Sequence, residues 1–106
     1  MSEVPAPIQA MIDATNAGDH EAFVAAFTPD AVLVDWGKEF DGAAGIAAWD
    51  DSDNIGRGSR FNVVAGAPEG DTWVLTLDVS GDGFNGTSDF RFELEGDLIR
   101  RMEIQP

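Results

Sequence analysis

Apolar residues near the start of the chain recur with the period of an α-helix. The positions i, i+3, i+4 and i+7 are occupied by Ile8, Met11, Ile12 and Thr15. This spacing puts them on one face, so it predicts a helix with a single buried stripe. Pro7 suits the first turn, where its missing N–H is not needed, and Gly18 marks the end of the helix.

A second helix is predicted directly afterwards, capped by Asp19. Its apolar face would comprise Ala22, Phe23, Ala26 and Phe27. It would end at Thr28, because a residue before proline avoids the helical region. A third helix of about two turns is predicted from Gly42, with Ile46 and Trp49 on one face. The polar, glycine-containing residues 50–59 predict a loop.

The remaining segments have the alternation or the β-branched residues typical of strands. The predicted strands are residues 31–36, 39–41, 61–67, 73–79 and 88–94, and a last one that ends at Ile104. Helices and strands segregated in this way indicate an α+β fold of one domain, residues 1–106. Because long antiparallel strands twist and curl, we expect a cone-shaped, curved sheet wrapped around the three N-terminal helices, with a cavity inside.

Composition narrows the possible functions. The chain has 106 residues, no cysteine and a formal net charge of -14, from 20 acidic against 6 basic side chains. The lack of cysteine excludes disulfides and thiolate metal sites. The charge opposes binding to nucleic acid or anionic membranes, since both need Lys and Arg. With no membrane-length apolar run and no signal-peptide pattern, a cytoplasmic location is expected, and neither a cofactor nor a metal is expected.

Three features that imitate ligand sites have simpler interpretations. Residues 81–86 match GxGxxG, but strand-like alternation follows where a dinucleotide site needs a helix, so a hairpin turn is predicted. The same turn partly imitates a calcium loop, whose ligand positions would be Asp78, Ser80, Asp82, Gly83 and Asp89. Its flanks are strands and its last position is not Glu, so turn chemistry accounts for these residues. His20, the sole histidine, is predicted to be an exposed surface residue.

Asp35 is the residue that we single out for its chemistry. It ends a hydrophobic strand directly before Trp36 and Gly37. Packed beside Trp36, Trp49 and Phe40, the carboxylate would be buried and would lose part of its water, which would make it a usable general base. A solvated strand-end carboxylate, or one that caps the turn, is the alternative that the sequence leaves open.

Several short motifs occur in a characteristic order along the chain. They are residues 16–19 (Asn-Ala-Gly-Asp), 27–32, 34–37 (Val-Asp-Trp-Gly), Gly42 with Ile46, 90–92 (Phe-Arg-Phe) and 96–99 (Gly-Asp-Leu-Ile). Together they resemble the nuclear transport factor 2-like superfamily, in particular its SnoaL-like and ketosteroid isomerase-like branch. The resemblance spans nearly the whole chain. It implies a curved mixed sheet around helices, a cystatin-like α+β barrel, with a pocket inside the cone.

Carried onto this chain, the resemblance places Asp35 where ketosteroid isomerases keep their catalytic aspartate. Those enzymes also use a tyrosine and a protonated aspartate as oxyanion donors, and the matching positions here are Met11 and Ser88. Because one lost oxyanion donor costs about 10²–10³ in rate, the familiar steroid isomerisation is not expected. Asp89 and Arg91 lie on the strand face opposite Phe90, so they are expected to form an exposed or interface pair instead of a water-activating Asp-Arg-Asp site.

Two functions remain open. As an enzyme, the protein would use Asp35 as the general base for isomerisation, cyclisation or hydration of a small hydrophobic substrate. The expected pocket residues are Trp36, Phe40, Trp49, Asp53, Phe61, Thr76, Ser88, Phe90 and Met102. As a binding or scaffold module, it would hold a ligand without turnover and form a homodimer, as family members commonly do through the outer sheet face. An apolar patch would be present there if three side chains point outward: Trp73, Leu75 and Leu77.

Overall fold

The computed structural model describes residues 4–105 and consists of helices packed against one six-stranded sheet. The helices are α1 (Ala6–Ala17), α2 (His20–Ala25) and α3 (Gly42–Asp53), followed by a short 3₁₀ helix, η1 (Ile55–Arg57). The strands are β1 (Phe27–Asp35), β2 (Lys38–Asp41), β3 (Arg60–Glu69), β4 (Thr72–Ser80), β5 (Gly86–Glu95) and β6 (Leu98–Ile104). None of these helices is long and apolar enough to cross a membrane.

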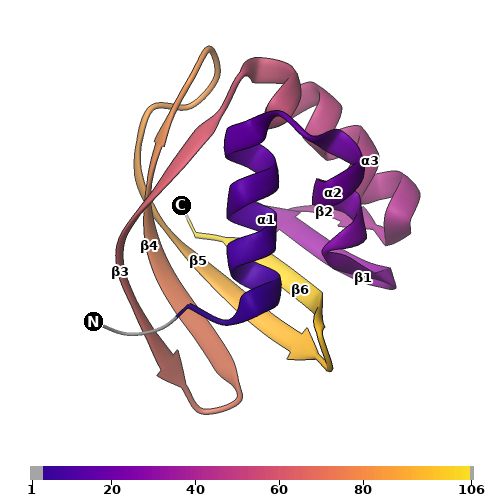
Figure 1. The fold of residues 1–106 in the computed structure, drawn as a ribbon, viewed down its shortest axis with the longest axis vertical. Helices are drawn as coiled ribbons and strands as arrows, with labels where there is room; N and C mark the ends of the chain where they lie inside the picture. Colours follow the sequence, from indigo (N-terminus) through magenta and orange to yellow (C-terminus); the bar gives the residue numbers. More distant parts are fainter. Residues whose placement is uncertain (1–3, 106) are drawn as a thin grey trace.

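The sheet is mixed and curved. Its strand order is β2-β1-β6-β5-β4-β3, in which β1 and β6 run parallel and all other neighbours run antiparallel. Figure 1 shows the long strands β3, β4 and β5 bending around α1, with α2 and α3 on the same concave side. The predicted α+β fold, a curved sheet wrapped around three N-terminal helices, is confirmed.

The core lies between the concave face of the sheet and the helices. On β4, Leu75 and Leu77 are fully buried, and Trp73 packs against the same core. Trp73 pairs with Phe92 and Leu75 with Phe90, so all of these side chains share the inner face. The sequence left open which way Trp73, Leu75 and Leu77 point, and the structure places them on the inner face, toward the helices, so they form no outward apolar patch.

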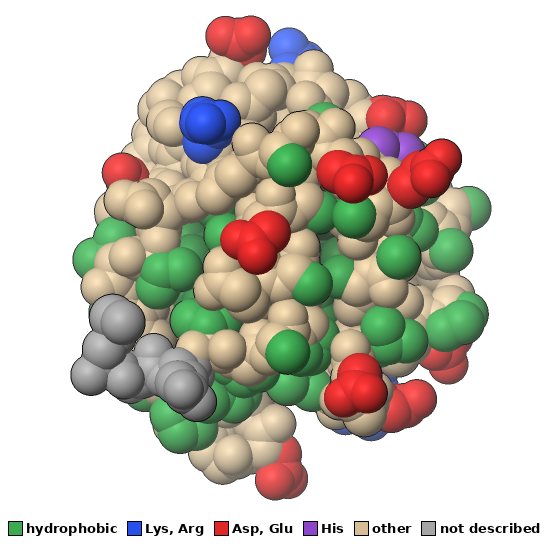
Figure 2. Space-filling model, in the orientation of Figure 1, with side chains coloured by type: hydrophobic (Ala, Val, Ile, Leu, Met, Phe, Trp, Pro, Cys, Tyr) green, Lys and Arg blue, Asp and Glu red, His purple; other side chains and the backbone are tan. Residues whose placement is uncertain are grey.

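The outer face of the sheet is polar. Arg91 pairs with Glu69 at 3.3 Å, and Thr76 Oγ1 donates a 2.7 Å hydrogen bond to Asp89. Asp89 and Arg91 thus lie outside, as predicted, but each has a different partner from the one expected. Acidic side chains are spread over the helix side as well, where Figure 2 shows many of them and few basic ones.

Two element boundaries differ from the predicted ones. α2 ends at Ala25, and Phe27 already pairs with Ile99 at the start of β1. Pro29 is tolerated within β1 because the register with β6 shifts between Phe27 and Val32, where no ladder hydrogen bond is needed. α3 continues to Asp53 and takes in residues predicted to be a loop. Asp50 lies one turn after Ile46, on the buried face of this helix.

Candidate ligand-binding pocket

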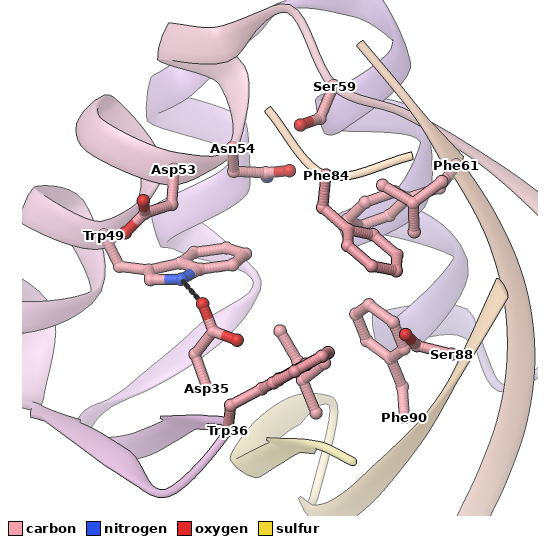
Figure 3. Close-up of a pocket in the computed structure, with 12 residues that line it drawn as sticks. Asp35, Trp36, Trp49, Asp53, Asn54, Ser59, Phe61, Phe84, Ser88 and Phe90 are labelled. Atoms are coloured by element: carbon pink, nitrogen blue, oxygen red, sulfur yellow. Dashed lines mark hydrogen bonds between the residues drawn. The ribbon is translucent and has the colours of Figure 1, made fainter. Parts of the chain in front are cut away.

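A cavity of about 350 Å³ lies between α3, the inner face of the sheet and the β4–β5 turn (Figure 3). This volume falls at the lower end of the range of ligand pockets, about 300–1,000 Å³. The cavity is lined by Asp35, Trp36, Trp49, Asp53, Asn54, Ser59, Phe61, Val79, Phe84, Ser88, Phe90 and Ile104. Mainly aromatic walls with a few polar groups are the usual composition of a small-molecule site.

Asp35 reaches the cavity from the end of β1. The indole Nε1 of Trp49 donates a 3.0 Å hydrogen bond to Asp35 Oδ2 (Figure 3). The residue is half-buried, whereas the sequence predicted a buried carboxylate. Within residues 4–105, no hydrogen bond uses its second oxygen, Oδ1. The bond from Trp49 fixes the position of the carboxylate at the edge of the cavity. Oδ1 is left free to accept a proton or a ligand donor.

Trp36 and Phe84 stand at the mouth of the cavity. Their ring centroids are 6.2 Å apart in an edge-to-face arrangement, and the two residues are 56% and 46% exposed. Trp36 and Gly37 form the two-residue turn between β1 and β2, with φ of 51° and 87°. Such a turn requires positive φ, which strains a residue as bulky as tryptophan. The strained turn holds a large exposed indole where an entering ligand would meet it.

The inner wall is aromatic and carries one hydroxyl from the sheet. Phe61 of β3 and Phe90 of β5 pack edge to face with centroids 5.5 Å apart, and Trp49 of α3 lies across from them (Figure 3). Ser88 shares the inner face of β5 with Phe90 because residues two apart on a strand point to the same side. Its hydroxyl is therefore available to a ligand.

Most of the predicted site residues line this cavity: Asp35, Trp36, Trp49, Asp53, Phe61, Ser88 and Phe90. Phe40, Thr76 and Met102 do not, which corrects the predicted set. Thr76 is on the outer face of β4. Phe40 is half-buried on β2, with Lys38 Nζ 5.2 Å from its ring centroid.

Met102 is fully buried in the core, opposite Leu33 and Phe92, and so is Met11, which matches the tyrosine position of the isomerases. Met102 was predicted to line the pocket because a strand pattern gives the face of a residue but not its depth along the cone.

Five lining residues were not predicted: Asn54, Ser59, Val79, Phe84 and Ile104. Val79 and Ile104 follow the inward alternation of their strands, so that signal was present in the sequence. Asn54, Ser59 and Phe84 lie in segments that were predicted to be a loop and a turn. Their contribution depends on how η1 and the β4–β5 turn fold over the cavity, which alternation does not report.

His20 was predicted to be an exposed surface residue, but the structure pairs it with a buried carboxylate. Its Nδ1 lies 2.6 Å from Oδ2 of Asp50, which is fully buried, while the His20 side chain is 38% exposed. The hydrogen bond to Asp50 raises the pKa of His20 above its ordinary value of 6.5, with smaller contributions from Asp51 and Glu21 and against the opposing effect of burial. The pair forms because α2 packs against α3, a contact between segments thirty residues apart in sequence.

Asp50 connects His20 to the cavity wall. Its Oδ1 accepts a 2.9 Å hydrogen bond from Asn54 Nδ2 and a 3.4 Å one from the backbone N–H of Ile55. Asn54 Nδ2 also donates to Thr15 Oγ1 at 3.1 Å. We call His20, Asp50, Asn54 and Thr15 the buried network. It runs from the surface of α2 to a residue that lines the pocket.

Within residues 4–105, no group of three or more His, Asp or Glu side chains is placed to hold a metal ion. The turn that imitates a calcium loop is closed by Asn85, whose Nδ2 donates to the carbonyl oxygen of Gly81 at 2.9 Å and whose Oδ1 accepts from the N–H of Gly81. The predicted hairpin between β4 and β5 is confirmed.

The cone-shaped α+β fold with an internal pocket defines a nuclear transport factor 2-like protein, and solved structures agree. The structure named "putative polyketide cyclase" from Sinorhizobium meliloti superposes with a TM-score of 0.84 at 26% identity, covering 96% of this chain and 95% of that one. RV0760c from Mycobacterium tuberculosis, in complex with estradiol-17beta-hemisuccinate, gives 0.81 at 18% identity, covering 96% and 93%. A ketosteroid isomerase-like fold from Catenulispora acidiphila, in complex with trimethylamine, gives 0.80 at 18% identity, covering 98% and 87%.

The family follows from the sequence itself. The SnoaL-like domain matches residues 8–102, and the chain belongs to this family. No curated protein matches it.

Proposed function

We propose that this protein binds a small, largely apolar molecule in the pocket and that Asp35 acts on it as a general base, as in isomerisation, cyclisation or hydration. The observation that carries the proposal is the Asp35 carboxylate, held by Trp49 at 3.0 Å in a cavity with aromatic walls. A base needs a fixed, ionised carboxylate within reach of the substrate. The small molecules bound by the two structural neighbours support the use of such a pocket.

The reaction is not the familiar steroid isomerisation. Met11, at the position of the isomerase tyrosine, is buried in the core, so it offers no donor to a ligand. Ser88 lines the pocket and supplies one hydroxyl. In this pocket, a reaction whose intermediate carries a full negative charge on oxygen would lack the hydrogen-bond donors that normally stabilise such an oxyanion.

A neutral proton-transfer probe tests the base without knowledge of the natural substrate. In 5-nitrobenzisoxazole, removal of the C3 proton breaks the N–O bond and leaves a nitrile and a coloured phenolate. We expect the wild type to accelerate this elimination, and Asp35→Asn to lower the rate by about 10²–10⁴ while a neutral ligand still binds. Asp97→Asn, in the β5–β6 turn, makes the same charge change away from the pocket and serves as the control.

Two results would count against Asp35 as the base. One is a wild type no faster than buffer, and the other is an Asp35→Asn variant as fast as wild type. Either would leave ligand binding without turnover as the function of the pocket.

We also propose that the protein is a cytoplasmic homodimer. β3 is an edge strand, and it exposes Val63 and Val64 at 39% and 60%. Exposed apolar residues on an edge strand favour pairing with a second copy. Light scattering at micromolar concentration should give twice the mass of the chain, and a monomer mass would refute the dimer.

A further inference from the structure

The polar groups that the pocket presents to a ligand are mainly acceptors. Asp35 and Asp53 contribute carboxylates, and none of the described residues that line the cavity is Lys, Arg or His. The hydroxyls of Ser59 and Ser88 can rotate, so they donate or accept as a ligand requires. Asn54 is the one side-chain amide in the lining, and its orientation decides whether it offers the cavity a donor or an acceptor.

The buried network fixes that orientation. Asn54 is 1% exposed, and its Nδ2 uses both hydrogens, one toward Asp50 Oδ1 at 2.9 Å and one toward Thr15 Oγ1 at 3.1 Å. The Thr15 hydroxyl gives its own hydrogen to the carbonyl of Met11, so toward Asn54 it can only accept. A flipped amide would set its oxygen against the buried carboxylate of Asp50, which is unfavourable.

Asn54 therefore turns its carbonyl oxygen, Oδ1, to the cavity. Figure 3 shows the side chain reaching toward the open space, and within residues 4–105 no hydrogen bond uses this oxygen. His20 holds the arrangement from the other side, because its 2.6 Å contact supplies the positive partner of the Asp50 carboxylate. The N–H groups of this amide, which could have bound an anion, are therefore already used within the buried network.

The remaining walls also favour positive charge. Trp36, Trp49, Phe61, Phe84 and Phe90 line the space in front of Asp35, and aromatic faces attract cations. The formal charge of the whole chain, -14, lowers the local concentration of anions and raises that of cations.

We propose that the pocket selects a small protonated amine with an apolar body. The ammonium group donates to Asp35 Oδ1, the apolar body lies against the aromatic rings, and a further donor on the ligand would meet Asn54 Oδ1. This inference rests on the proposed function, since it takes the cavity to be the ligand site.

Three probes of equal size and different charge test the selectivity: benzylamine, benzyl alcohol and benzoate. Isothermal titration at pH 7 and low salt should give benzylamine at least about tenfold tighter than benzyl alcohol, and benzoate the weakest of the three. Asp35→Asn should weaken benzylamine by at least about tenfold and leave benzyl alcohol within about twofold. Asp97→Asn, which changes the total charge equally, should leave all three affinities unchanged.

Equal affinities for the amine and the alcohol, or tighter binding of benzoate, would overturn the amine preference. So would a loss of benzylamine affinity in Asp97→Asn as large as that in Asp35→Asn, because the total charge would then explain the binding. The elimination of the neutral benzisoxazole does not depend on ligand charge. Its failure contradicts the base, whereas failure of the amine series contradicts only the substrate class.

Discussion

At the scale of single residues, two buried threonines differ in the use of their hydroxyls. Thr15 Oγ1 donates to the carbonyl of Met11 at 3.0 Å and accepts from Asn54. Thr28 Oγ1 is buried in β1 with no partner among the described residues. A satisfied buried hydroxyl stabilises a fold modestly, whereas an unsatisfied one costs more than an apolar group of the same shape.

Valine, which has the shape of threonine, separates the two cases. Thr15→Val should lower the free energy of unfolding by about 1–3 kcal/mol, because it leaves one N–H of the buried Asn54 amide without an acceptor. Thr28→Val should leave it unchanged or raise it by up to about 1 kcal/mol. Urea denaturation measures both. Similar losses in the two variants would show that the hydrogen bonds of Thr15 add nothing.

The raised pKa of His20 makes the stability depend on pH. Since the pKa in the folded state lies above the ordinary value of 6.5, the pair with Asp50 stabilises the fold fully below pH 6.5. This contribution is lost as the pH rises through the raised pKa. The melting temperature of the wild type should therefore fall above pH 6.5, and His20→Gln should remove that slope. A wild type whose melting temperature stays constant across this range would contradict the pair.

At the scale of elements, the junction of α3 and η1 shapes the pocket, because Asn54 and Ser59 lie on its two sides. The junction is tight at Gly56. A Cβ atom there would sit 1.5 Å from the backbone oxygen of Asp51, which no side chain can do without moving η1. Glycine is therefore required here for close approach, although φ at Gly56 is ordinary.

Gly56→Ala should destabilise the protein by more than about 2 kcal/mol and weaken ligand binding, because the clash is with backbone and η1 lies between the lining residues Asn54 and Ser59. Gly83→Ala is the matched control. A Cβ at Gly83 would make ordinary contacts, 3.5 Å to the Arg57 side chain and 4.0 Å to the Asp53 carbonyl oxygen, so this variant should be close to wild type in thermal melts. Comparable melting of the two variants would refute the steric argument.

At the scale of the whole molecule, charge is the dominant feature. Basic side chains gather on the outer face of the sheet, where Arg100 and Arg101 pair with Glu93. Such exposed pairs add little, about 0–1 kcal/mol each. Acidic neighbours repel elsewhere: on β2, the hydrogen bond to Asp41 and the repulsion from it raise the pKa of Glu39. Repulsion among like charges opposes the compact state.

Salt should therefore stabilise this protein. Raising sodium chloride from about 0.01 M to about 0.1 M shortens the screening length from about 30 Å to about 10 Å. If screening recovers 1 kcal/mol, the melting temperature rises by about 4–8 °C. Calorimetry at the two salt concentrations measures the shift, with an equal osmolarity of sucrose as the uncharged control. A melting temperature that falls with salt would mean that attractive ion pairs outweigh the repulsion.

The sequence alone determined the elements and the class of fold. The helical spacing from Ile8 to Thr15 and the alternation through Phe90 and Phe92 are local consequences of backbone geometry, so they can be read without a structure. The same alternation, together with the motif that ends in Trp36 and Gly37, identified most of the residues predicted to line the pocket.

Only the tertiary structure decided which side chains meet. Asp50 falls in the polar, glycine-containing segment that predicts a loop, yet it lies buried in α3, where α2 brings His20 to within 2.6 Å of it. Trp49 was expected beside Asp35, but its donation of a hydrogen bond to that carboxylate depends on how α3 lies across the end of β1. The physical reason is range: backbone periodicity acts over a few residues, whereas pairing of buried polar groups depends on contacts between distant segments, which only the packed fold defines.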